Sequence, residues 1–171
     1  MVSNYKTYCM TREEFLHEVI RMKGEIIHYV SLNEYQMNFI LADYLNSDED
    51  KILFGMAIMN KLNFNNRIDI FKHFLNKKNN DFRTKYPDLL KNINEMQTIR
   101  NKFAHSMNQV PHKENFNIDD EFFILKTDKF DATDFARTTY NSTQHKFNLA
   151  ILKKTLVELV EISGLKGANF D

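Results

Sequence analysis

Apolar side chains recur every three or four positions through most of the chain, which is the spacing of one buried helical face. The first helix is predicted to follow the capping box of Thr11 and Glu14, whose hydroxyl and carboxylate can satisfy two free backbone amides. The pattern leaves open a kink at Gly24 or a break near Ser31. The predicted buried stripe of this helix is Ile26, Val30, Met37, Leu41 and Tyr44.

Four more helices are predicted from the same periodicity, and they begin near Asp48, Asn65, Pro87 and Ser142. Proline suits a first turn because its missing amide has no intrahelical partner there. The helix that starts at Pro87 is expected to run straight through residue 105, and the last helix is expected to stop at Gly164. The inward-facing positions of these helices are Ile52, Leu53, Met56, Met59, Leu62, Ile68, Ile70, Phe71, Phe74, Leu89, Ile93, Met96, Ile99, Phe103, Leu149, Leu152, Leu156 and Leu159.

The helical pattern is interrupted between residues 110 and 140. Within this insertion the run 121–127 is aromatic and branched enough to form a short strand, while its surroundings are polar. We therefore predict an all-α fold in a single domain over residues 1–171. It is a bundle of about five helices with an irregular insertion, holding a short strand, before the last helix.

Composition narrows the class of protein. The chain has 23 basic and 23 acidic side chains, so no overall charge draws it to nucleic acids or membranes. A single cysteine, Cys9, excludes an internal disulfide framework and favours a reducing compartment. The first ten residues lack an apolar secretion segment, and the run 52–59 is far shorter than the roughly 20 residues of a membrane span. We expect a cytoplasmic protein without a membrane segment.

The stretch from Arg100 to His105 is the main candidate for chemistry, but its arginine–histidine spacing is uninformative in this chain. Three other pairs have comparable spacing, namely Arg12 with His17, Arg67 with His73, and Arg21 with His28. What distinguishes the 100–105 stretch is the set of residues around the pair. On a continuous helix Asn101 would share one face with His105, and the polar residues Thr98 and Asn94 would extend that face. Arg100 would reach the same face with its long side chain.

The sequence Ile99-Arg100-Asn101-Lys102-Phe103-Ala104-His105-Ser106 resembles the "iRNxfAHs" signature of HEPN domains. It is most similar to the mannitol-repressor-like and related bacterial branch, in which an "F…L.F..RI" segment, matched here by Phe54 to Ile68, precedes the motif. The resemblance is tight over about ten residues and loose over roughly 25–165, and it leaves out the insertion.

The resemblance implies a metal-independent endoribonuclease, such as a toxin or antiphage effector, whose cleft forms where two motif helices of a homodimer meet. In this scheme His105 acts as general base or acid. Arg100 holds the scissile phosphate and Asn101 orients the histidine or the phosphate. Lys102 and Thr98 are the expected substrate-binding residues. RNA and an antitoxin or other protein are the expected partners, and no metal or cofactor is expected.

Two alternatives to a ribonuclease come from other classes of protein. The first is a non-catalytic HEPN-like regulatory or scaffolding protein that dimerises through the motif helix. The second is a DNA-binding repressor, which we do not expect because no segment combines a short glycine turn with a basic recognition helix. A metal site is not expected either. His112 and His145 lack recognisable partner ligands, and the acidic residues of 119–134 lack the glycine and closing glutamate of a calcium loop.

Overall fold

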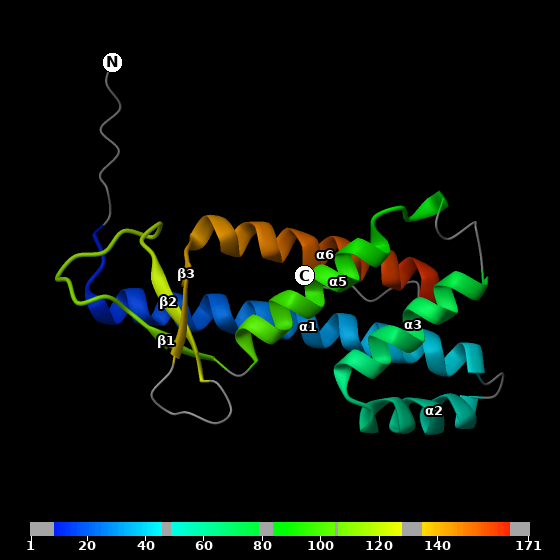
Figure 1. The fold of residues 1–171 in the computed structure, drawn as a ribbon. Coiled ribbons are helices and arrows are strands. Elements are labelled where there is room, and N and C mark those ends of the chain that lie inside the picture. The colour runs from blue at the N-terminus through cyan, green and yellow to red at the C-terminus, as the bar shows by residue number, and fades with distance from the viewer. Residues whose placement is uncertain (1–8, 46–48, 79–83, 105, 128–134, 165–171) are drawn as a thin grey trace, which may run out of the picture. The chain divides into compact units, whose positions relative to one another are not determined.

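A computed structural model describes residues 9–45, 49–78, 84–104, 106–127 and 135–164, and helices occupy most of them (Figure 1). The helices are α1 (Arg12–Leu45), α2 (Glu49–Lys61), α3 (Phe64–Lys78), α5 (Leu89–Phe103) and α6 (Ser142–Ser163). The strands are β1 (Ser106–Gln109), β2 (Phe122–Thr127) and β3 (Phe135–Tyr140). None of the helices in these ranges is long and apolar enough to cross a membrane.

The predominantly helical character and the strand at 121–127 are confirmed, but the all-α class is wrong. The three strands form one antiparallel sheet in the order β1-β2-β3 (Figure 1). Two of these strands, β2 and β3, lie within the insertion that was expected to be largely irregular. β2 pairs on both sides, with β3, whose aromatic and β-branched residues favour a strand, and with β1, whose residues have little strand preference of their own.

The predicted helix ends are confirmed at two places. At the start of α1 the Thr11 amide donates to Glu14 Oε2 at 2.7 Å, and the Glu14 amide donates to Thr11 Oγ1 at 3.3 Å. This reciprocal pair is the capping box. At the end of α6, Gly164 adopts a left-handed backbone with a φ of 66°, which favours glycine because it has no Cβ. α1 is continuous from Arg12 to Leu45, without a break at Ser31.

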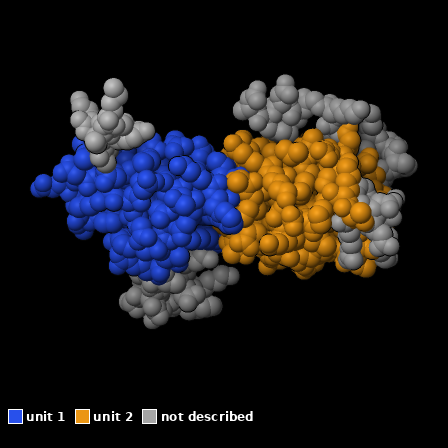
Figure 2. Space-filling view, turned by 90° about the horizontal axis from the view of Figure 1, so that it is seen from above, with its two compact units in different colours: residues 1–27, 100–149 blue, residues 28–99, 150–171 orange. Residues whose placement is uncertain are grey.

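The chain divides into two compact units, each assembled from separate segments (Figure 2). Unit 1 consists of residues 1–27 and 100–149, and unit 2 consists of residues 28–99 and 150–171. The boundaries fall within α1, α5 and α6, so each of these helices contributes residues to both units. The single domain expected from the sequence stays a prediction.

Unit 2 has a helical core in which most of the predicted stripe residues are buried. The buried residues that were predicted are Val30, Met37, Leu41, Met59, Ile68, Phe71, Phe74, Leu89, Ile93, Met96, Ile99, Leu152, Leu156 and Leu159. Ala42 and Leu75 are buried as well and were not predicted. Two predicted core residues are instead exposed, Tyr44 at 43% and Ile70 at 37%. The Tyr44 ring still packs on Phe74, with 4.7 Å between ring centroids. The helical period therefore located the core and misplaced residues at its edge.

Unit 1 is built around the sheet. Phe122 and Ile124 of β2 are buried on one side, as expected for alternate residues of a strand. Phe123, on the other side, is covered by the Arg137 guanidinium, which lies 3.3 Å from the ring centroid. Residues before α1 join this unit too. Met10 and Phe116 exchange backbone hydrogen bonds of 2.8 and 2.9 Å, and the rings of Phe15 and Phe116 stack at 4.6 Å.

The carboxylate of Glu158, in unit 2, is largely buried and has few polar partners. Glu158 has a side chain only 12% exposed, its nearest basic partner Lys154 is 3.8 Å away, and its Oε2 has no hydrogen-bond partner among the described residues. Burial raises the pKa of Glu158 above its ordinary value of 4.5, with smaller contributions from Asp88 and Glu161, against the lowering effect of Lys154. The folded protein therefore holds this proton more tightly than the unfolded chain does, and stability is lost as the pH rises through the folded pKa.

Glu158→Gln is accordingly expected to stabilise the protein at pH 7, because the glutamine cannot ionise. Below pH 4.5 the Glu158 carboxyl is protonated in the folded and in the unfolded protein. The variant and the wild type should therefore have the same free energy of unfolding there. Urea denaturation at pH 4 and pH 7 measures the difference. Glu95→Gln, at an exposed position of the same unit, is the control and should show no such gain. A Glu158→Gln protein less stable than wild type at pH 7 contradicts the prediction.

Candidate active site at the end of α5

The last turn of α5 carries three of the predicted site residues, Arg100, Asn101 and Lys102, all of which belong to unit 1. Asn101 is exposed, and Arg100 and Lys102 are half-buried. Two basic residues in a last turn are favourable because the unpaired carbonyls there carry partial negative charge. The turn thus presents two cations and one amide from a stable helix end.

Phe103 fixes this turn in the core of unit 1. Its side chain is fully buried, and its ring meets the ring of Tyr140 edge-on, with centroids 5.0 Å apart and an interplanar angle of 79°. Tyr140 is also fully buried and makes a second edge-on contact with Phe122 at 5.4 Å. The motif is therefore anchored to β2 and β3 through one aromatic cluster.

The expectation that the motif helix runs through residue 105 is wrong. α5 ends at Phe103, and β1 begins at Ser106 and pairs with Lys126 of β2. The Ser106 hydroxyl donates to the Phe103 carbonyl at 3.1 Å and so satisfies one of the free carbonyls at the helix end. Helical periodicity therefore does not put residues 101 and 105 on one face. His105 itself lies outside the described residues.

A lysine from α1 holds the segment that follows the motif. Lys23 Nζ donates to the Ser106 carbonyl oxygen at 2.6 Å in a partly buried setting. Ser106 is buried as well. The chain is thus held on both sides of residue 105, by Phe103 in the aromatic cluster and by Ser106 between α1 and β2.

Thr98, the remaining predicted substrate-binding residue, lies one turn earlier on α5 and belongs to unit 2. It is exposed, and its hydroxyl donates to the Asn94 carbonyl of its own helix at 3.2 Å. The hydroxyl oxygen can still accept a hydrogen bond from a ligand, but its hydrogen is already donated to the helix backbone.

Two of the arginines with comparable histidine spacing have structural partners. Arg67 pairs with Glu34 at 2.9 Å, with only 11% of the arginine side chain exposed, and its guanidinium lies over the Phe64 ring. Arg21 pairs with Glu18 at 2.8 Å and with Glu25 at 2.7 Å. These contacts account for both arginines without any role in catalysis.

An open pocket of about 400 Å³ adjoins the motif within unit 1. Its lining residues are Lys102, Tyr140, Thr143, Gln144, Phe147 and Asn148. Four of them come from the first two turns of α6 and share one helical face. Asn141 caps that helix, since its Oδ1 accepts from the Gln144 amide at 3.0 Å and its own amide donates to Gln144 Oε1 at 3.1 Å.

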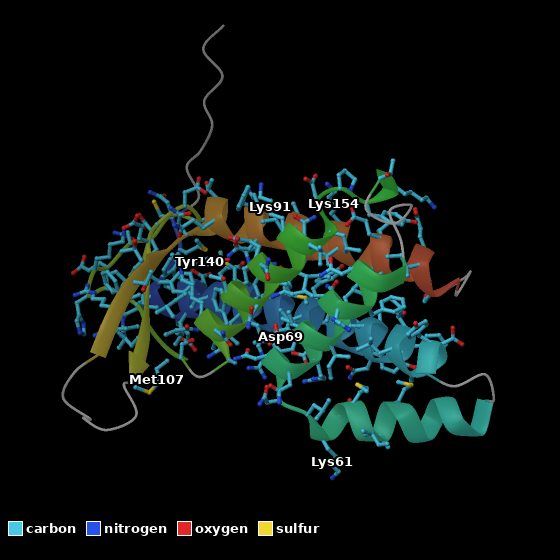
Figure 3. All side chains as sticks on the ribbon, turned by 45° about the vertical axis from the view of Figure 1, so that its right-hand side comes forward. Lys61, Asp69, Lys91, Met107, Tyr140 and Lys154 are labelled. Atoms are coloured by element: carbon cyan, nitrogen blue, oxygen red, sulfur yellow. The ribbon has the colours of Figure 1, made fainter. Side chains whose placement is uncertain are left out.

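Tyr140 links the pocket to the motif and can be seen at the end of β3 (Figure 3). The Lys102 ammonium lies 5.0 Å from the centroid of its ring, within range of a cation–π interaction. Asn148 Nδ2 donates to the Tyr140 hydroxyl oxygen at 3.1 Å. Burial raises the pKa of Tyr140 far above its ordinary value of 10.0, although the Asn148 hydrogen bond lowers it somewhat. The phenol therefore stays neutral at cellular pH and acts as a hydrogen-bonding group.

A second histidine of unit 1, His145, has a structural partner. It is 4% exposed, and its Nε2 lies 2.7 Å from Glu25 Oε2. Burial raises the pKa of Glu25, but the His145 hydrogen bond and the charge of Arg21 outweigh it and leave the pKa below its ordinary value. This network joins the start of α6 to α1. It gives His145 a role other than that of a metal ligand.

The pocket residues other than Lys102 were not identified from the sequence. The available signals were the strand-forming residues 135–140 and the Asn141 cap before a clear helix. Those signals predict that a strand is followed directly by a helix. They do not predict that Lys102 lies over Tyr140, the last residue of the strand, because the two residues are far apart in sequence.

No group of three or more histidine, cysteine, aspartate or glutamate side chains among the described residues is arranged to hold a metal ion. Comparisons of the chain with protein-family models, with curated proteins and with solved structures find no match.

Proposed function

We propose that this chain is an HEPN-type endoribonuclease that cleaves RNA without a metal, with its active site at the end of α5. The proposal is carried by the placement of Arg100, Asn101 and Lys102 on a helix turn that the buried Phe103 anchors and that adjoins an open pocket. Cations and an amide held beside an open pocket suit a phosphodiester substrate. The resemblance of residues 99–106 to the HEPN signature supplies the reaction.

The reaction is an attack of the ribose 2′-oxygen on the adjacent phosphorus. His105 takes the 2′-hydroxyl proton, the new O2′–P bond forms, and the P–O5′ bond breaks. The leaving 5′-oxygen receives a proton, so the products are a 2′,3′-cyclic phosphate and a 5′-hydroxyl. Arg100 stabilises the charge that grows on the phosphoryl oxygens, and Asn101 orients the phosphate or the histidine. Lys102 binds the neighbouring backbone, and Thr98, in unit 2, stays a predicted substrate-binding residue.

The proposal includes a homodimer. A single histidine cannot at once remove the 2′ proton and deliver one to the leaving oxygen, whereas two motifs related by a two-fold axis supply a base and an acid. The exposed Met107, which projects from β1 just after the motif, offers apolar surface for such an interface (Figure 3). The same surface suits the alternative function, a non-catalytic regulatory or scaffolding dimer, and also an antitoxin-like protein partner.

RNA cleavage in the presence of chelator tests the proposal. Wild-type protein incubated with total RNA and excess EDTA should produce fragments that end in cyclic phosphates. Arg100→Ala should cut about 100- to 1000-fold more slowly, because the transition-state charge loses its main partner. Arg12→Ala is the matched control, since Arg12 stands at the same spacing from His17 and should leave the rate unchanged.

Three results decide against the enzyme. RNA left intact by a folded wild-type dimer favours the regulatory or scaffolding alternative. Cleavage that EDTA abolishes shows a metal-dependent reaction instead. Equal rates for Arg100→Ala and wild type place the activity elsewhere in the chain or in a contaminant.

A further inference from the structure

Phe147 is the most exposed large hydrophobic residue in the described part of the chain, with 65% of its surface accessible. It lies on α6 and lines the pocket next to Lys102. An aromatic ring left in solvent at the edge of a pocket contributes little to a core, whereas it offers a flat apolar face to a planar ligand. The pocket therefore contains an aromatic surface, a cation and two side-chain amides.

These groups correspond to the parts of a nucleotide. A base can stack on the Phe147 ring, as bases do on aromatic residues of single-strand-binding proteins. The amides of Gln144 and Asn148 can donate to and accept from the edge of a base. The Lys102 ammonium can meet a phosphate. A volume of about 400 Å³ is in the range of pockets that bind small ligands of this size.

We infer that the Lys102–Phe147 pocket is a nucleotide subsite of the active site, and that it binds one unpaired nucleotide of single-stranded RNA beside the scissile bond. The base stacks on Phe147 and its phosphate lies at Lys102. The inference rests on the proposed function, because Lys102 is adjacent to Asn101 and so joins the pocket to the cleavage motif. It specifies the substrate as RNA with at least one unstacked base next to the cleavage site.

Tyr140 acts here as a positioning residue. Its buried ring makes a cation–π contact with the Lys102 ammonium, and its hydroxyl oxygen accepts a hydrogen bond from Asn148 Nδ2. Two groups that are to meet the same nucleotide are thus held by one side chain. Because Tyr140 is in the core of unit 1, its removal would disturb the fold, so the test uses the exposed pocket residues.

Binding of uncleavable mononucleotides to the full-length protein tests the subsite without requiring catalysis. Adenosine and uridine 3′-monophosphates are titrated, and the side-chain amide NMR signals of Asn148 and Gln144 are followed. Both signals should shift and saturate, whereas inorganic phosphate should bind more weakly because it lacks a base. Phe147→Ala should weaken nucleotide binding about 5- to 100-fold, the loss expected for one stacked base.

Two further variants separate the base from the phosphate. Lys102→Met should weaken binding of the nucleotide about tenfold or more but leave binding of the free nucleoside unchanged. Val157→Ala is the control, since Val157 is an exposed apolar residue on the same helix that does not line the pocket, and it should bind like wild type.

Failure of the subsite and failure of the enzyme give different results. Chelator-resistant cleavage by a protein whose Phe147→Ala variant binds nucleotides as tightly as wild type overturns the subsite alone. Unshifted amide signals at millimolar nucleotide, or equal binding of phosphate and nucleotide, also overturn it. Phe147-dependent nucleotide binding by a protein that leaves RNA intact supports nucleotide binding in this pocket and contradicts the proposed cleavage.

Discussion

Replacement of His105 by alanine is expected to slow RNA cleavage by about 100- to 10,000-fold, the range associated with the loss of one general acid or base. The imidazole is the group in the motif that can both accept and release a proton near neutral pH, since an unperturbed histidine titrates near pH 6.5. Arginine stays charged, and asparagine does not titrate. Single-turnover cleavage of a short labelled RNA measures the loss, and the wild-type rate should vary between pH 5 and 8 while the residual rate of the variant stays flat.

His17→Ala is the matched control for this substitution. His17 is exposed on α1 and stands at the same spacing from Arg12 as His105 does from Arg100. It should therefore retain the wild-type rate and pH profile. Thermal unfolding of both variants should match the wild type, which separates chemistry from folding. A folded His105→Ala protein that cleaves at the wild-type rate rules out the mechanism.

Phe103→Ala is expected to cost about 3–5 kcal/mol of stability, the usual loss for truncating a fully buried phenylalanine. The phenylalanine is 0% exposed and packs edge-on against Tyr140, so the smaller side chain leaves a cavity and removes an aromatic contact. Chemical denaturation monitored by circular dichroism measures the free energy of unfolding. A loss of this size is a large fraction of the stability of a typical domain.

Ile118→Ala is the comparison for this second substitution. Ile118 belongs to the same unit and is 43% exposed, so its truncation should change the stability by less than about 0.5 kcal/mol. A Phe103→Ala protein that unfolds at the same denaturant concentration as Ile118→Ala contradicts the anchoring role given to Phe103. Phe103→Leu retains most of the buried apolar volume, so its free energy of unfolding should lie between those of the two alanine variants.

Sequence periodicity predicted the helices well because their stability comes from apolar stripes that repeat within each segment. The capping pair Thr11 and Glu14, the stop at Gly164 and the strand at 121–127 are also local signals, and all three are confirmed. β1 is different. Its four residues, Ser106–Gln109, have little strand preference, and they are extended because β2 pairs with them.

The same distinction explains the site. Arg100, Asn101 and Lys102 were predicted together because they are adjacent in the chain. α5 ends one residue after them, at Phe103, because Ser106 belongs to β1. Ser106 pairs with Lys126 of β2, and its carbonyl oxygen accepts a hydrogen bond from Lys23. Those contacts join segments that the periodicity treats separately. The pocket was missed for the same reason, since Lys102 and Phe147 belong to elements separated by the whole sheet region.

The assembly of unit 1 from residues 1–27 and 100–149 has a consequence for synthesis of the protein. Phe15 is fully buried, and its stacking partner Phe116 is added to the growing chain about 100 residues later. At roughly 5–20 residues per second, the beginning of α1 waits on the order of 5–20 s for that partner. The nascent chain should therefore carry the apolar side of early α1 uncovered until Phe116 has been synthesised.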